Sequence, residues 1–191
     1  MTEPSRGCDP TARPALRFAA VVAALVEHRV EWVLTGSCVL AAYGAELNPN
    51  DVDVTPALDP ANLARIAAML DDLGARPAYL PNWPESPTLE ACAAWTPARP
   101  TEEHLDHLYV TSLGMIDIVP RLCGTYHDLL PTATTTRVAG HPVRVCDPAE
   151  VLARLEGRSR PKDLLRRLQY AEVAAAVRNG AQPGRLDRLR E

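Results

Sequence analysis

The chain has 191 residues, a hydrophobic content of 47% and a formal net charge of −4 at pH 7. This length fits one domain with a helical extension, and it is sufficient to bury a core without disulfides. The near-neutral charge gives no general attraction to nucleic acid, and an aromatic content of 5% offers few surfaces for stacking on bases. No apolar stretch approaches the length of a membrane span, so we expect no membrane contact.

Cysteine usage and composition indicate the setting of the protein. The five cysteines are scattered, and none forms a Cys-x-x-Cys pair typical of zinc or redox sites. Reduced thiols are therefore expected, as in a cytoplasmic protein. The N-terminal residues lack the apolar core of a signal peptide. The abundance of Ala, Arg and Pro is typical of a GC-rich bacterial genome.

The first half of the chain predicts alternating helices and strands. Residues 1–14 are rich in Pro, Arg and Thr and are expected to form a disordered arm. Apolar periodicity predicts a helix over 15–28, and an apolar run predicts a strand over 31–35. Gly36 ends that strand, and a second helix is expected over 37–43.

The central part of the chain combines regular elements with a proline-rich stretch. A strand is predicted over 51–55, followed by an amphipathic helix over 60–73. Residues 76–101 contain six prolines and are expected to form a long irregular loop. Two strands are then expected, over 104–111 and 115–119, joined by a tight turn.

The last elements complete a mixed fold. They are a helical turn, a β-hairpin and two closing helices, at residues 127–130, 134–138 with 143–146, 148–155 and 162–178. We expect an α/β domain over residues 15–146, with a mixed β-sheet flanked by helices. Residues 147–191 are expected to form a C-terminal helical segment. Its arginines are interleaved with acids, which favours a solvated helix face over an RNA-binding surface.

Asp51 and Asp53 form the most informative pair in the sequence. Residues i and i+2 of a strand point to the same face, about 6–7 Å apart at their Cα atoms. Two like charges this close are unfavourable unless a cation lies between them, so the pair predicts a metal site. The alternative is a pair of acids beside a turn at the edge of the sheet.

Asp117 is a third candidate acid, central to the apolar strand 115–119. Strand propensity and the cost of burying a charge both disfavour an acid in that position. The alternative is an outward-facing place on an edge strand. If Asp51, Asp53 and Asp117 lie on adjacent strands and face one cleft, they form a site for two Mg²⁺ ions.

Gly36 and Ser37 lie at the turn from a strand into a helix. A glycine allows a phosphate to approach the backbone closely, and a helix N-terminus offers free amides to an anion. The Ser37 hydroxyl adds another donor. The alternative is an ordinary helix cap after a tight turn.

The order of these residues resembles the nucleotidyltransferase superfamily, which shares a polymerase-beta-like palm. The shared features are Gly-Ser, a helix, Asp-x-Asp and a single Asp on a later strand. In particular, the chain is similar to small bacterial nucleotidyltransferases of the abortive-infection and toxin–antitoxin type. The resemblance covers about residues 31–119, with a weaker match at residues 160–163. Many relatives carry a basic residue and a Thr before Asp-x-Asp, where this chain has Asn48, Pro49 and Asn50.

The resemblance implies a role for each motif. Gly36 and Ser37 would hold the triphosphate of an NTP, expected to be ATP or CTP. Asp51 and Asp53 would ligate both the nucleotide-bound and the catalytic Mg²⁺, and Asp117 would complete the catalytic metal site. Lys162 would neutralise the triphosphate; its alternative is a solvated residue that opens a helix.

The expected activity is transfer of a nucleoside monophosphate to a hydroxyl acceptor. A tRNA end, a protein side chain and a small molecule are the alternatives for this acceptor. The alternative function is that of a non-catalytic partner protein, antitoxin-like or regulatory, that keeps the fold. These two functions are distinguished by whether the three carboxylates face one open cleft.

Overall fold

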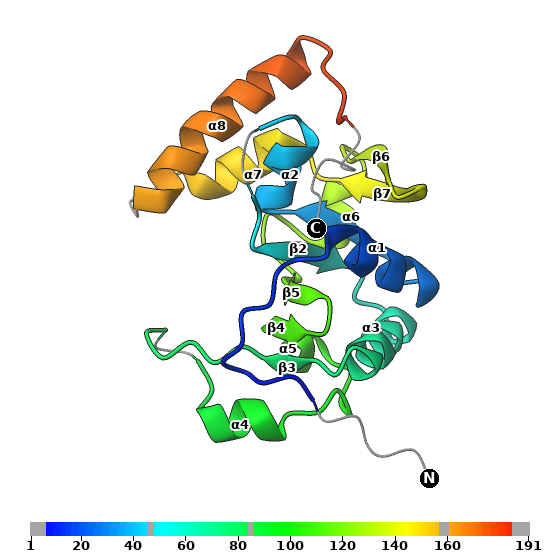
Figure 1. The fold of residues 1–191 in the computed structure, drawn as a ribbon. Helices are drawn as coiled ribbons and strands as arrows, with labels where there is room; N and C mark the ends of the chain where they lie inside the picture. The colour runs from blue at the N-terminus through cyan, green and yellow to red at the C-terminus, as the bar shows by residue number, and fades with distance from the viewer. Residues whose placement is uncertain (1–6, 46–47, 84–85, 157–160, 185–191) are drawn as a thin grey trace.

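The computed structural model describes residues 7–45, 48–83, 86–156 and 161–184, apart from the side chain of Lys162. In this part, the chain forms helices around one seven-stranded sheet (Figure 1). The helices are α1 (Phe18–Glu27), α2 (Ser37–Ala42), α3 (Pro60–Asp72), α4 (Leu89–Ala94), α5 (Glu102–Leu105), α6 (Tyr126–Leu129), α7 (Pro148–Leu155) and α8 (Pro161–Arg178). The strands are β1 (Trp32–Thr35), β2 (Asp51–Pro56), β3 (Arg76–Pro77), β4 (Leu108–Thr111), β5 (Gly114–Ile118), β6 (Thr134–Val138) and β7 (His141–Val145).

The sheet is mixed, with the strand order β3-β4-β5-β2-β1-β7-β6. The pairs β2–β5 and β1–β7 are parallel, and the other neighbouring strands are antiparallel. The predicted fold class is therefore confirmed: an α/β chain whose mixed sheet is flanked by helices and followed by a C-terminal helical segment. This arrangement is consistent with the nucleotidyltransferase-type sheet that the resemblance implies.

The core is centred on β1, where all four residues are buried. Two groups of helices surround the sheet. Helices α1 and α3 contact each other, and α8 contacts both α2 and α7 (Figure 1). A central strand that is covered on both faces is held rigidly, because its side chains are packed on each side. The strand that precedes the Gly36 turn is thus a firm base for the residues that follow it.

A buried amide fixes the ends of β1 and β2. Asn62 of α3 is fully buried and donates hydrogen bonds to the carbonyl oxygens of Glu31 (2.9 Å) and Ala57 (2.8 Å). Its Oδ1 accepts from the amide of Glu31 (2.8 Å). Helix α3 itself begins with Asp59, whose side chain accepts from the amide of Asn62, and with a proline in the first turn. These bonds satisfy the buried amide and set the position of both strands.

The proline-rich stretch is more regular than predicted. Residues 76–101 contain the short strand β3 and the helix α4, not one irregular loop. The next strand was predicted to begin at residue 104. Residues 102–105 instead form helix α5, and the strand β4 begins only at Leu108. The physical reason is N-capping: the hydroxyls of Thr88 and Thr101 accept hydrogen bonds from amides in the first turns of α4 and α5. These local caps outweigh the proline content around them.

The N-terminal segment, predicted to be disordered, packs on the domain from Gly7 onward; residues 1–6 lie outside the described part. The amide of Cys8 donates to the carbonyl oxygen of Gly74 (2.7 Å), and the amide of Tyr79 donates to that of Pro10 (2.9 Å). Arg13 adds a bond from Nη2 to the Tyr79 carbonyl oxygen (2.7 Å). Residues 7–14 therefore form one wall of the molecule beside β3.

Two helices, α7 and α8, follow the sheet in sequence and contact each other. Asp147 caps α7, and its side chain accepts from the amide of Ala149. Helix α8 is the longest of the described helices, at 18 residues. No helix in the described ranges has both the length and the apolar character needed to cross a bilayer.

Candidate active site

Three carboxylates lie on one face of two neighbouring strands. In β2, Val52 and Val54 are fully buried, whereas Asp51 and Asp53 are partly exposed on the opposite face. In β5, Asp117 is the partly exposed residue of an otherwise buried strand and is the register partner of Asp53. Directly paired residues of adjacent strands point to the same face. The three candidate acids therefore share one face of two neighbouring strands.

The turn at Gly36 lies directly against one of these acids. Gly36 has φ +63° and ψ −146°, a conformation that is essentially restricted to glycine. A Cβ atom at this position would lie 1.8 Å from Oδ2 of Asp53, so no side chain fits there. The amide of Ser37 donates a hydrogen bond to the Asp53 carboxylate. The Ser37 side chain is buried at 4% exposure, so the turn approaches the site through its backbone.

Further contacts hold the turn and β2 together. Thr35, the register partner of Asp53 in β1, donates from its hydroxyl to the Asp53 carbonyl oxygen (3.3 Å). Cys38 is fully buried, and its Sγ lies 3.4 Å from the carbonyl oxygen of Asp51. These contacts fix the backbone on which the carboxylates stand.

Burial and mutual repulsion disfavour the ionised form of the acids. The pKa of Asp53 is raised to about 7, chiefly by burial and then by the charge of Asp51. The pKa of Asp117 is raised to about 8, again chiefly by burial and then by Asp53 and Asp51. Both shifts mean that the carboxylates lack sufficient positive charge near them in the free protein.

A fourth acid, Asp106, adds to the negative charge. It follows α5, and its charge contributes to raising the pKa of Asp117. Burial and the charge of Glu102 raise its own pKa. The sequence analysis did not single out Asp106 as a candidate, because its segment was expected to be a strand. Only the helix α5 and the turn after it bring this carboxylate near the other acids.

Two arginines of the C-terminal helices face the acids. The charges of Arg166 in α8 and Arg154 in α7 both lower the pKa of Asp53, and Arg154 also lowers that of Asp117. Lys162, the basic residue expected to contact a triphosphate, lies in the first turn of α8, but its side chain is outside the described part. The sequence contained the arginines but gave no signal to separate these two from the other basic residues of this segment.

Tyr170 links the C-terminal helix to the Gly36 turn. Its hydroxyl donates a short hydrogen bond of 2.5 Å to the carbonyl oxygen of Gly36, and the residue is 2% exposed. Burial and then the nearby charge of Asp53 raise the pKa of this phenol well above its usual range. Residues 134 positions apart in sequence therefore meet at the site.

The donor set suits a divalent cation. Carboxylate oxygens are the ligands that Mg²⁺ prefers, and at Asp53 and Asp117 burial and mutual repulsion outweigh the attraction of the nearby arginines, so both pKa values are raised. Among the described residues, no three Asp, Glu, His or Cys side chains already form a ligand cluster. A bound cation would therefore have to draw Asp51, Asp53 and Asp117 together from their present positions.

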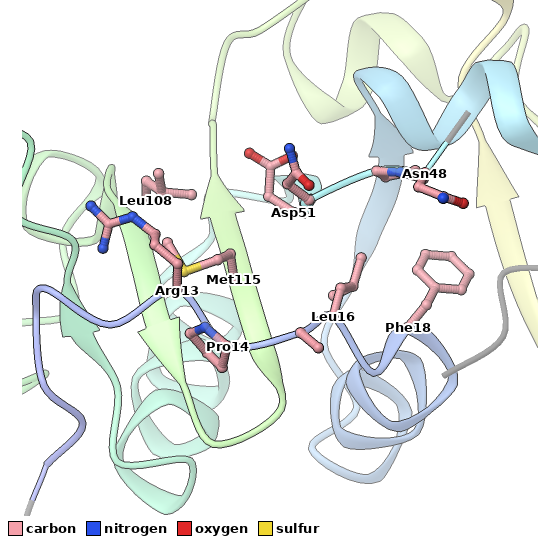
Figure 2. A pocket seen from close by; sticks show the side chains of 11 residues that line it. Arg13, Pro14, Leu16, Phe18, Asn48, Asp51, Leu108 and Met115 are labelled. Atoms are coloured by element: carbon pink, nitrogen blue, oxygen red, sulfur yellow. The ribbon is translucent and has the colours of Figure 1, made fainter.

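A pocket of about 710 Å³ opens beside Asp51 (Figure 2). Its walls come from three parts of the chain: the segment at 13–18, residues 48–50 before β2, and the strands β4 and β5, through Leu108 and Met115. Asp51 thus belongs both to the row of acids and to the pocket. The site has two sides, the Gly36 turn next to Asp53 and this pocket next to Asp51.

Comparison with known proteins adds little to this geometry. No protein-family model matches the chain, and no curated protein sequence matches it. Among solved structures, the chain is similar to the antibiotic-resistance factor ANT(2'')-Ia, with a TM-score of 0.45 and 13% identity. That alignment covers 83% of this chain and 88% of the other. A likeness this weak carries no argument about activity, so the function is argued from the site itself.

Proposed function

We propose that the protein is a nucleotidyltransferase that moves a nucleoside monophosphate from an NTP to a hydroxyl acceptor. One observation carries the proposal: Asp51, Asp53 and Asp117 share one face of β2 and β5, directly beside the glycine turn at Gly36. Acids on adjacent strands next to a backbone turn are an arrangement suited to holding a metal–triphosphate.

The donor would bind on the side of the Gly36 turn. The triphosphate is anionic, and Arg154 and Arg166 supply positive charge toward the acids from the C-terminal helices. Mg²⁺, held by Asp51, Asp53 and Asp117, would supply charge stabilisation at the phosphates. Lys162 in the first turn of α8 remains a proposed additional contact.

The transfer step follows from the position of the acids. The oxygen of the acceptor hydroxyl attacks the α-phosphorus, the bond from this phosphorus to the β-phosphate oxygen breaks, and pyrophosphate leaves. Asp117, the register partner of Asp53 on β5, would in its ionised form help activate the acceptor hydroxyl and take up its proton. The products are pyrophosphate and the nucleotidylated acceptor, which balances the reaction.

The test is calorimetric titration of ATP, CTP, GTP and UTP, with and without Mg²⁺. Wild type is compared with Asp53→Asn and with Asp71→Asn, a control at an exposed aspartate of α3. We expect Mg²⁺-dependent binding of one or more nucleotides to wild type and control, weakened at least about tenfold in Asp53→Asn. Folded wild type that binds no nucleotide would overturn the proposal as a stand-alone enzyme.

A second function is favoured by the surface of α8. Leu164, Leu165 and Leu168 are 48%, 63% and 68% exposed and lie on one side of this helix. Such a row suits contact with another protein, as expected of an antitoxin-like or regulatory partner. The partner-protein function becomes the favoured one if the folded wild type binds no nucleotide. It is tested by sedimentation of wild type against Leu165→Ser: a self-association that the substitution removes favours it.

A further inference from the structure

The pocket beside Asp51 has the size of a small-molecule site. Its volume of about 710 Å³ falls within the range of about 300–1,000 Å³ usual for sites that enclose small ligands. It reaches the row of acids through Asp51; the described residues that line it do not include Gly36 or Asp53. A molecule in the pocket would therefore contact Asp51 without contacting the glycine turn.

Apolar and polar surface line the pocket in similar amounts, with slightly more apolar surface. Leu16, Phe18, Leu108 and Met115 contribute apolar side chains. One arginine and one aspartate line it, so the lining has no net charge. An RNA end would require several basic side chains around the pocket to meet its phosphates. The lining instead favours a ligand with an apolar body.

Arg13 is the fixed cation of this pocket. Its Nη1 donates to the carbonyl oxygens of Pro10 (3.1 Å) and Ala12 (2.6 Å), and its Nη2 donates to that of Tyr79 (2.7 Å). These backbone partners orient the guanidinium, whose charge also interacts with that of Asp9, and a guanidinium has five N–H donors in all. Figure 2 shows Arg13 and Asn48 on opposite sides of Asp51.

We propose that this pocket is the acceptor site and that it takes a small hydroxylated molecule with an apolar body and an anionic group. The hydroxyl would lie at Asp51, the apolar body against Leu108 and Met115, and the anionic group at Arg13. The inference rests on the proposed nucleotidyl transfer and narrows its acceptor to one chemical class. A tRNA end would need more basic side chains than this one arginine, and the arginine would repel a polycationic amino sugar.

The test uses two matched probes, 4-(hydroxymethyl)benzoate and its neutral analogue 1,4-benzenedimethanol, in NMR titrations of the full chain. The blocking variant is Ala15→Trp, at an exposed position that lines the pocket. The control is Ala64→Trp, on the exposed face of α3 and outside the pocket lining. Kanamycin and total tRNA are assayed in parallel for release of pyrophosphate from each NTP.

We expect the benzoate to bind wild type and Ala64→Trp, and to bind Ala15→Trp at least about tenfold more weakly. The neutral analogue should bind wild type about three- to fivefold more weakly than the benzoate, and Arg13→Gln should remove this difference. The inference is overturned if neither probe binds at millimolar concentration or if Ala15→Trp binds the benzoate normally. It is also overturned if tRNA or kanamycin serves as acceptor equally well in wild type and Ala15→Trp.

Failure of this inference is separable from failure of the proposed function. Nucleotide affinity is measured by calorimetry on the same wild-type and Ala15→Trp proteins, whose glycine turn is unchanged. If both proteins bind nucleotide in a Mg²⁺-dependent manner but Ala15→Trp does not weaken binding of the benzoate, only the acceptor assignment is overturned. The absence of any nucleotide binding overturns the transferase itself.

Discussion

The hydroxyl of Tyr170 in α8 donates a hydrogen bond to the carbonyl oxygen of Gly36, the residue whose Cα faces the Asp53 carboxylate. One bond thus couples the C-terminal helix to the turn that borders the acids. Because α8 also carries Arg166, the position of this cation depends on how the helix docks. The contact explains why the helical segment after the sheet is part of the site and not an appendage.

Tyr170→Phe should loosen that docking. Removal of the hydroxyl takes one donor from the Gly36 carbonyl oxygen, which keeps a bond from the amide of Val39 (3.2 Å), and a hydrogen bond of this kind is typically worth about 0.5–1.5 kcal/mol. We expect a lower midpoint in urea unfolding and weaker NTP binding, since Arg166 is held less firmly. Tyr79→Phe, on the N-terminal side of the molecule, is the control and should leave NTP affinity unchanged. Equal NTP affinity in wild type and Tyr170→Phe would contradict the coupling.

Gly36→Ala should disable the site more than it destabilises the fold. The new Cβ would lie 1.8 Å from Oδ2 of Asp53, and the backbone at φ +63° and ψ −146° disfavours alanine, at a cost of about 1–3 kcal/mol. Displacement of Asp53 should reduce Mg²⁺-dependent NTP binding at least about tenfold. The control is Gly44→Ala, where φ is +94° and the added Cβ meets nothing within 4 Å. Two variants with equal NTP affinity would show that the Asp53 contact is irrelevant.

The stability of the metal-free protein should fall as the pH rises. The folded-state pKa values of Asp53 and Asp117, about 7 and about 8, exceed their ordinary value of 3.8. The folded chain therefore binds protons more tightly than the unfolded chain, and the free energy of unfolding decreases between about pH 4 and pH 8. Thermal unfolding in the presence of EDTA measures this slope. A Tm that rises between about pH 4 and pH 8 would contradict the raised pKa values of Asp53 and Asp117.

Mg²⁺ should reverse this loss at high pH. Ionised carboxylates bind the cation and protonated ones do not, so the gain in Tm on adding Mg²⁺ should be larger near pH 8 than near pH 5.5. Each kcal/mol of stabilisation corresponds to about 2–4 °C in a chain of this size. An equal gain in Tm at about pH 5.5 and about pH 8 would indicate that Mg²⁺ does not bind at these carboxylates.

Asp117→Asn should stabilise the metal-free protein at about pH 8 while reducing transfer. The amide is neutral at every pH, so it removes a charge that burial and the neighbouring acids disfavour. The predicted gain is about 1 kcal/mol or more, read as a Tm increase in EDTA. Pyrophosphate release should drop at least about a hundredfold, in line with loss of a general base. Asp71→Asn, at an exposed position, should change neither property.

Arg166→Gln should weaken NTP binding about tenfold, because a charge-assisted contact to phosphate is worth about 1.5–3 kcal/mol. The loss should shrink at high salt, which screens the interaction. Arg178→Gln, at the far end of the same helix, is the matched control. If both substitutions weaken binding to the same degree, α8 acts only through its general positive charge.

Short-range signals in the sequence determined most of the fold and the nature of the site. Apolar periodicity located β1, β2, β5 and the long helix α3, because each of these elements buries one face or both. Alternation along β2 placed Asp51 and Asp53 on one face, and the burial cost of an acid in an apolar strand singled out Asp117. The main local error was to overlook helix α4 inside the proline-rich stretch and helix α5 directly after it, because the prolines hid their threonine caps.

Only the tertiary structure decided which distant residues meet these acids. The parallel register of β2 and β5 pairs Asp53 with Asp117, and strand order is a property of the whole sheet that no local pattern encodes. The docking of α8 brings Tyr170 to Gly36, and the path of the N-terminal segment builds the pocket beside Asp51. These contacts join segments far apart in sequence, so they depend on global packing and not on the propensity of either segment.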